Sequence, residues 1–166
     1  YAGGLVSKLE VSDLIVADQV VDVESSAEFL PDQQWLRLAQ KISVSENYKV
    51  ISGKLVTANK VIHSPLDKKE FGERLSAQAV EMETSAIAKV VMDKNLPFLS
   101  VRAISDSVEQ EILDSSSFLG RDGEISKLKA GWYVLTHPGS ISSAISLRSQ
   151  TQRATRTMTD FVLHLL

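Results

Sequence analysis

The segment spanning residues 77–106 constrains the fold more than any other part of the chain. Residues 78–80 form a short extended run, residues Thr84–Asp93 have helical spacing of small and apolar side chains, and residues 98–104 form an apolar run of strand length. A strand, a helix and a second strand in this order indicate an α/β fold. We expect the two strands to be parallel and to end at the same edge of the sheet.

Three carboxylates follow these two predicted strands. Glu81 and Glu83 come directly after the first strand, and Asp106 follows the second. Because open α/β sheets bind ligands at the carboxyl ends of their strands, we predict that Glu83 and Asp106 converge on one crevice. Each acid also has an ordinary structural explanation, since carboxylates favour helix N-termini and aspartate often caps a helix.

The preceding part of the chain supplies further elements of an α/β domain. Residues 13–23 are rich in β-branched side chains and predict a strand whose start is buried on both faces. Pro31 and Asp32 open a helix that runs to about Ile42, with Trp35 expected as a core residue rather than a stacking platform. Residues 48–62 predict one or two strands with a bend near residues 52–53.

The next element is a helix with a strong start signal. Ser64 is expected to be its N-cap, Pro65 its first helical residue, and Asp67 a carboxylate beside the free backbone amides. The pattern predicts an end near Leu75.

The C-terminal third is polar at first and then helical by pattern. Residues 107–122 read as a loop, either a plain surface loop or a lid beside the site. Helices are predicted over residues 125–135 and from Ile141 to the end. The second carries an apolar stripe, with arginines off it, which favours packing on the sheet over lying on a membrane surface. The stripe comprises Ala144, Ile145, Ala154, Met158, Phe161, Val162 and Leu165.

Composition excludes several classes of function. The 166 residues have a net charge of −3, no cysteine and 43% hydrophobic residues, which suits a single domain over residues 1–166. Scattered basic residues argue against nucleic acid, and no apolar run approaches the roughly 20 residues of a membrane span. The histidines, His63, His137 and His164, lack ligand spacing, so we expect neither a metal nor another cofactor.

Two motifs carry a family resemblance. The run Val80-Glu81-Met82-Glu83-Thr84-Ser85-Ala86, followed by Val101-Arg102-Ala103-Ile104-Ser105-Asp106, resembles the paired signature of the purine nucleoside phosphorylase superfamily. The pair is most similar to that of the methylthioadenosine/adenosylhomocysteine nucleosidases and related nucleoside phosphorylases. The opening run Ala2-Gly3-Gly4-Leu5, followed by residues 11–16, also looks like the family, although Tyr1 stands where the family usually has a small hydroxyl residue.

The resemblance implies a fold and an activity. The fold would be a phosphorylase/hydrolase-like three-layer α/β/α domain. We expect this domain to be truncated at its N-terminus, because the sequence begins at Tyr1 rather than at a methionine and has a glycine-pair turn directly afterwards. The activity would be cleavage of the N-glycosidic bond of an adenine-type purine nucleoside. The resemblance further implies a cytoplasmic homo-oligomer whose partner is this small molecule, with phosphate as a possible co-substrate.

The resemblance also implies a role for eight residues. Asp106 would protonate or hydrogen-bond the imidazole-ring nitrogen of the purine, and Glu83 would bind the ribose hydroxyls. Met82 would pack on the sugar and Ser105 would orient the base. The purine edge would meet the backbone of Val61 and Ile62, and the base would lie against the turn at Ala2 and Gly3. Glu81 is left outside this set as a structural residue paired with Arg102.

The chemistry suits these residue types, because glycosidic cleavage builds negative charge on the leaving base and positive charge on the ribose. Hydrolysis is the first hypothesis. A phosphate-dependent phosphorylase, a nucleoside-binding protein without catalysis and a scaffold fragment without nucleoside binding remain alternatives. The group that activates the nucleophile is expected upstream of Tyr1.

Overall fold

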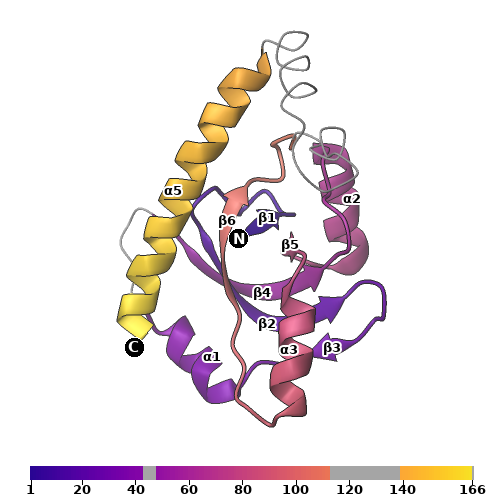
Figure 1. The fold of residues 1–166 in the computed structure, drawn as a ribbon, viewed down its shortest axis with the longest axis vertical. Coiled ribbons are helices and arrows are strands. Elements are labelled where there is room, and N and C mark those ends of the chain that lie inside the picture. Colours follow the sequence, from indigo (N-terminus) through magenta and orange to yellow (C-terminus); the bar gives the residue numbers. More distant parts are fainter. Residues whose placement is uncertain (43–47, 113–138, 166) are drawn as a thin grey trace, which may run out of the picture.

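The computed structural model describes residues 1–42, 48–112 and 139–165. Their elements form one mixed sheet with helices around it (Figure 1). In chain order they are β1 Ala2–Gly4, β2 Leu14–Asp22, β3 Glu28–Phe29, α1 Gln33–Gln40, β4 Val50–Thr57, α2 Pro65–Leu75, β5 Ala79–Glu81, α3 Thr84–Asp93, β6 Val101–Asp106 and α5 Gly139–Leu165. The predicted helix over residues 125–135 and most of the predicted loop over residues 107–122 lie outside the described residues.

The sheet has the strand order β3-β2-β4-β5-β1-β6, and β6 also pairs with β2. Five strands therefore close on themselves. β5 runs antiparallel to β1, while β1 runs parallel to β6. The prediction that the strands before Glu83 and Asp106 are parallel is therefore wrong, because β1 lies between them and reverses their relative direction.

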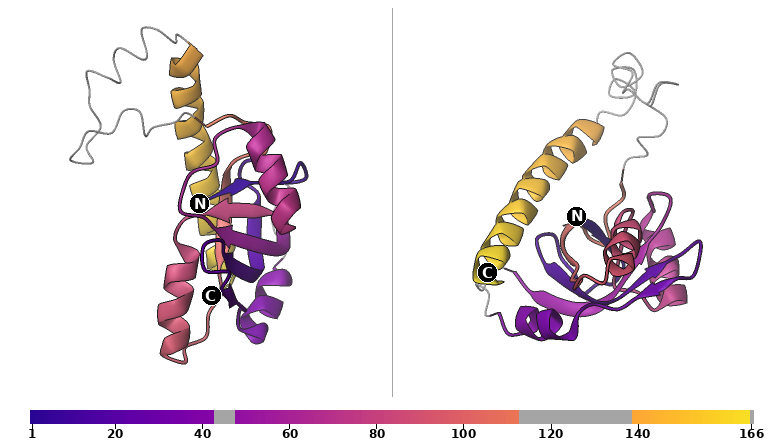
Figure 2. Two further views of the ribbon diagram at one scale, coloured as in Figure 1. Left: turned by 90° about the vertical axis from the view of Figure 1, so that its right-hand side faces the viewer. Right: turned by 60° about the horizontal axis from the view of Figure 1, so that its bottom comes forward.

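Three apolar clusters hold the helices against the sheet. Alternate residues of β2 face two of them: Ile15 belongs to the cluster that contains Ala88 of α3, and Leu14 to the cluster shared by α1 and α5. A third cluster packs α2 beside the end of β4. In the right view of Figure 2 the sheet curves beneath α3, with α1 and α5 on its outer side. Helices thus cover both faces of the sheet, in agreement with the predicted three-layer α/β/α class.

The predicted helix starts are confirmed by their caps. The Ser64 side chain accepts a hydrogen bond from the Asp67 amide at 3.1 Å, and Asp32 accepts from the amides of Gln34 and Trp35. Trp35 itself is 37% exposed, so its prediction as a core residue is wrong. Leu36 and Ala39 fill the core instead, because α1 packs through the neighbouring stripe of its surface.

Two strand predictions need adjustment. Residues 48–62 contain the single strand β4, and the irregularity expected near Gly53 lies in its partner, where the β2–β4 register shifts between Ala17 and Gln19. β6 starts at Val101 rather than at Phe98 and includes Asp106 as its last residue. Phe98 still lies in the core, and its carbonyl accepts a hydrogen bond from the Asp32 amide.

The last helix packs on the sheet as expected. Ala154 and Phe161 of α5 are fully buried in the cluster with Leu14 and Ala103. Tyr48 donates a hydrogen bond to Asp160 at 2.8 Å and ties the lower part of α5 to the chain before β4. Among the described helices none combines the length and apolarity of a membrane span.

Candidate active site

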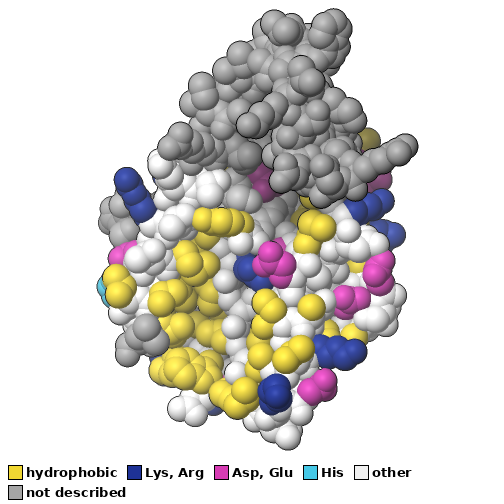
Figure 3. Space-filling model, viewed as in Figure 1, with side chains coloured by type: hydrophobic (Ala, Val, Ile, Leu, Met, Phe, Trp, Pro, Cys, Tyr) yellow, Lys and Arg dark blue, Asp and Glu magenta, His cyan; other side chains and the backbone are white. Residues whose placement is uncertain are grey.

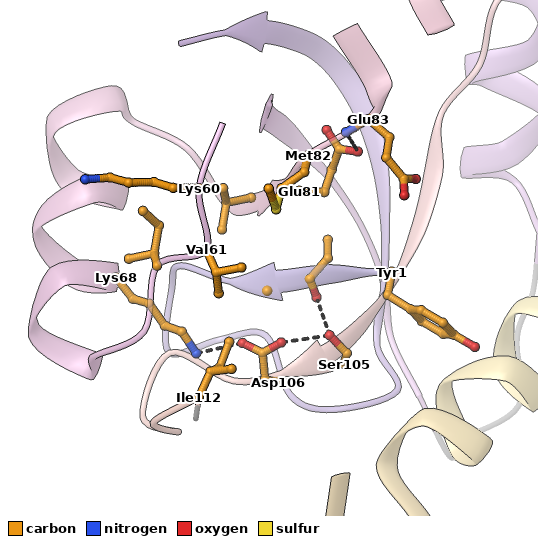
Figure 4. A pocket seen from close by; sticks show the side chains of 14 residues that line it. Tyr1, Lys60, Val61, Lys68, Glu81, Met82, Glu83, Ser105, Asp106 and Ile112 are labelled. Carbon is orange, nitrogen blue, oxygen red and sulfur yellow. Dashed lines mark hydrogen bonds and ion pairs between the residues drawn. The ribbon is translucent and has the colours of Figure 1, made fainter. Parts of the chain in front are cut away.

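All eight residues that the sequence singled out line one cavity. Its volume is about 270 Å³, close to the lower end of the usual range for small-molecule sites, about 300–1,000 Å³. Ala2 and Gly3 of β1 line it together with residues from three other segments, several of which Figure 4 labels. The predicted residues from these segments are Val61, Ile62, Met82, Glu83, Ser105 and Asp106.

The short strand β1 brings these segments together. Gly3 pairs with Val80 of β5 on one side and with Asp106 of β6 on the other. A Cβ atom at Gly3 would lie 3.0 Å from Oδ2 of Asp106, so a side chain here would press on the carboxylate. The absence of a side chain at Gly3 leaves Asp106 free to face the cavity.

Asp106 is buried and its two oxygens have different partners. Oδ1 accepts a hydrogen bond from the Ser105 hydroxyl at 2.7 Å, and Oδ2 accepts one from Lys68 Nζ at 2.6 Å. The Ser105 hydroxyl also lies 3.3 Å from the carbonyl of Ala2. Asp106 is thus held in one orientation at the wall of the cavity (Figure 4).

Glu81 has the structural role that the sequence predicted. Its Oε2 atom accepts hydrogen bonds from the amides of Glu83 and Thr84 and lies 3.1 Å from Nη2 of Arg102. Its Oε1 atom accepts from the Thr57 hydroxyl at 2.6 Å. Both oxygens of Glu81 are therefore committed to fixing the turn into α3, although the residue borders the cavity.

Glu83 is the other acid of the cavity, and its environment is open. Its side chain is 71% exposed and has one ion-pair contact, 3.4 Å to Nη1 of Arg102. Glu83 stands at the N-cap of α3 but makes no capping hydrogen bond with its side chain. Glu83 stands at the helix N-terminus, where a negative charge is favourable, and the absence of a capping bond leaves its carboxylate available to a ligand beside Met82.

The opposite wall comes from the chain between β4 and α2. This segment carries Val61 and Ile62 and is tied to the chain after β6, because the Ile112 amide donates to the His63 carbonyl at 3.0 Å. Ile112 completes this side of the cavity. The wall is mainly apolar, which suits a flat aromatic ring.

A polar cluster supports the turn that carries Met82 and Glu83. Asp22, at the end of β2, accepts a hydrogen bond from the Ser85 hydroxyl at 2.7 Å. The Ser25 amide, the Ser85 hydroxyl and the Ser25 hydroxyl together lower the pKa of Asp22 to about 2, against the small opposing effect of burial. The Ser85 amide in turn donates to Thr57, which also holds Glu81.

Sequence reasoning missed a buried charged residue of the cavity wall, Lys68. Its side chain is fully buried, although lysine is almost never buried without a partner. A signal was present, since Lys68, Phe71 and Leu75 share one face of α2 and the latter two pack in the core. Lys60, Ile112 and Tyr1 also line the cavity without having been predicted to do so.

The arrangement offers acid–base and hydrogen-bonding chemistry. Of the three carboxylates that line the cavity, Asp106 is buried and oriented, Glu81 has both oxygens in hydrogen bonds, and Glu83 is exposed and can accept hydrogen bonds from a ligand. Apolar side chains also line the cavity. Across the described ranges, no group of three or more histidine, cysteine or acidic side chains is placed to hold a metal ion.

Comparison with known proteins identifies the family. The family model described as the phosphorylase superfamily matches residues 1–127. The chain is 30% identical over 141 residues to a 5'-methylthioadenosine/S-adenosylhomocysteine nucleosidase from Shewanella frigidimarina, covering 74% of this chain and 61% of the relative. It is 32% identical over 124 residues to the nucleosidase of the same name from Staphylococcus haemolyticus, covering 63% and 53%.

The fold is also that of solved nucleosidase structures. The crystal structure of the 5'-methylthioadenosine/S-adenosylhomocysteine nucleosidase from Colwellia psychrerythraea, in complex with adenine, superposes with a TM-score of 0.69 at 20% identity. The match covers 99% of this chain and 62% of that one. The chain therefore spans somewhat over half the length of the relatives it matches.

Proposed function

Because the chain belongs to the phosphorylase superfamily, we propose that its cavity binds an adenine-type purine nucleoside and cleaves the N-glycosidic bond by hydrolysis. The observation that carries the proposal is that two acids in different environments line one largely apolar cavity. Asp106 is buried and oriented, and Glu83 is exposed and makes no capping hydrogen bond. The names of the relatives, and the adenine bound to one of them, support the same substrate class.

The two acids take different roles in the proposed reaction. As the bond between ribose and base breaks, its electron pair moves to the base, and a proton delivered through Asp106 neutralises the purine ring. Glu83 accepts hydrogen bonds from the ribose hydroxyls, and its negative charge stabilises the positive charge that develops on the sugar. Met82 covers the sugar, and Val61 with Ile62 meets the base.

The proposal is tested by incubating the protein with 5'-methylthioadenosine in buffer with and without phosphate. The release of adenine is measured by chromatography. Release in phosphate-free buffer, lost in Asp106→Asn, is the expected result. If adenine is released only when phosphate is present, the protein is a phosphorylase and not a hydrolase. Calorimetric binding without release would leave a nucleoside-binding protein, and no binding at all would refute the proposal.

The proposal includes a homo-oligomer in the cytoplasm. Exposed apolar side chains gather over α3, which supports a protein interface there (Figure 3). They include Ile87, Val90 and Met92, which are 51%, 55% and 42% exposed. Sedimentation equilibrium tests the oligomer and cell fractionation tests the location.

A further inference from the structure

Each of the three N–H donors of Lys68 has an acceptor within the protein. Its Nζ atom lies 2.6 Å from Oδ2 of Asp106, 3.0 Å from the Ser107 carbonyl and 2.8 Å from the Gln110 carbonyl. An ammonium group has three N–H donors and no acceptor, so three acceptors match its charged form. Lys68 therefore stands as a buried cation whose donors are all used.

A cation in this position fixes the acid beside it. The Lys68 side chain is 1% exposed and that of Asp106 is 9% exposed, so little water screens the pair. Removing one partner of such a pair leaves the other as an uncompensated buried charge. The same ammonium group also holds the chain after β6 through two carbonyls, which anchors the segment that leads to Ile112.

The carboxylate of Asp106 keeps free acceptor capacity toward the cavity. An ionised carboxylate has about four lone-pair sites. Ser105 uses a site on Oδ1 and Lys68 a site on Oδ2, which leaves one on each oxygen. Asp106 in this state can only accept a hydrogen bond, so it selects a ligand that presents an N–H group.

Building on the proposed function, we propose that Lys68 is a positioning and specificity-determining residue that holds the Asp106 carboxylate in place as a hydrogen-bond acceptor. The cavity then prefers purine rings that carry a proton on the imidazole nitrogen facing Asp106, the form of the departing base. In the cleavage step the electron pair of the glycosidic bond moves to the base, and one proton passes from Lys68 Nζ through Asp106 to this nitrogen. The oxygen of a water molecule bonds to the ribose carbon, and the proton that the water loses restores the charge of Lys68 after the step.

Two nucleoside analogues test the preference directly. 9-Deazaadenosine has an N–H at this ring position, whereas 7-deazaadenosine has a C–H there. Calorimetry on the full chain is expected to show a preference of about tenfold or more for 9-deazaadenosine, since hydrogen bonds to charged groups are the stronger ones. In Lys68→Met the preference should fall to about threefold or less.

Lys69→Met is the matched control. Lys69 is the next residue of α2, its side chain is 44% exposed, and it pairs with Glu109 in the same loop that Lys68 contacts. The preference should stay within about twofold of the parent value in this variant, because exposed pairs contribute little. A purely structural role of Lys68 would weaken both ligands equally and leave the ratio unchanged, which would overturn the inference.

The outcomes separate the inference from the proposed function. If the parent protein binds neither analogue, the proposed function fails. If it binds both equally, or if Lys68→Met keeps the preference, the inference alone fails. Should Lys68→Met not fold, carbon NMR of the parent protein, with Asp106 assigned through Asp106→Asn, decides the case. An ionised carboxylate at neutral pH supports the inference, and a protonated carboxyl contradicts it.

Discussion

At the residue scale, the site depends on one position without a side chain. Gly3→Ala places a Cβ 3.0 Å from Oδ2 of Asp106 and should turn the carboxylate away from the ligand. We expect adenine affinity to fall about tenfold, measured by calorimetry, while the melting temperature changes little. Gly4→Ala is the control, because its Cβ would have ordinary contacts of 3.4 Å and longer. Equal affinity in both variants would show that Asp106 does not contact the base.

A second residue-scale prediction concerns the support beneath Glu83. Hydrogen bonds from Ser25 and Ser85 lower the pKa of Asp22 from 3.8 to about 2, so folding is stabilised above pH 3.8 and this stabilisation is lost as the pH falls toward 2. Asp22→Asn should remove a contribution on the order of 1 kcal/mol, allowing for solvent screening, and flatten the decline between about pH 4 and 2.

Urea unfolding at several pH values measures this effect. Asp18→Asn changes an exposed residue of the same strand and serves as the control. A parallel decline for the parent and Asp22→Asn would contradict the role given to Asp22.

At the element scale, α5 is fixed to the sheet by a buried tyrosine. Burial, and then the hydrogen bond to Asp160, raise the pKa of Tyr48 to about 12. Because the folded pKa exceeds the unfolded one, the stabilisation is complete below pH 10 and is lost as the pH rises through 12. Tyr48→Phe should cost about 1 kcal/mol at neutral pH and lose less stability than the parent above pH 10.

Tyr1→Phe is the comparison for that variant. Tyr1 shares a hydrogen bond of 2.6 Å with Thr155 of the same helix, but at an exposed site. Thermal unfolding of the parent protein and the two variants at neutral pH should give the lowest melting temperature for Tyr48→Phe. If Tyr1→Phe costs as much, burial of Tyr48 is not what anchors α5.

Elements with local signals could be predicted from the sequence. The start of α2 is defined locally, since the Ser64 side chain accepts a hydrogen bond from the amide of Asp67 and Pro65 is the first helical residue. The bounds of α3 are those that its sequence pattern indicated. β1 could not be predicted as the strand between β5 and β6, because three residues carry no periodicity and their pairing is set by distant partners. The predicted parallel arrangement of β5 and β6 was wrong for the same reason.

The burial of Lys68 illustrates a similar limit within the site. A lysine on a helix is ordinarily a solvent-facing residue, and only the approach of Asp106 and two loop carbonyls from later in the chain makes its burial stable. Four of the eight residues found by resemblance, Met82, Glu83, Ser105 and Asp106, lie in the two motifs that are continuous in sequence. The partner that fixes Asp106 lies outside either motif.

At the scale of the whole molecule, the closed ring of five strands explains why distant segments meet at one cavity. The cavity is lined by β1, by the chain after β5, by the chain between β4 and α2 with Lys68 of α2, and by the end of β6 with the chain that follows it. The two acids have separate roles in the proposed site, since Asp106 contacts the base and Glu83 contacts the sugar. The affinity for a ligand without a sugar should therefore not depend on Glu83.

Calorimetry of Glu83→Gln with 9-deazaadenosine and with 9-deazaadenine tests this division most directly. We expect about a tenfold loss of affinity for the nucleoside, because hydrogen bonds to a charged acceptor are lost, and less than about a twofold change for the free base. An equal loss for both ligands, or no loss for the nucleoside, would contradict the assignment of Glu83 to the ribose.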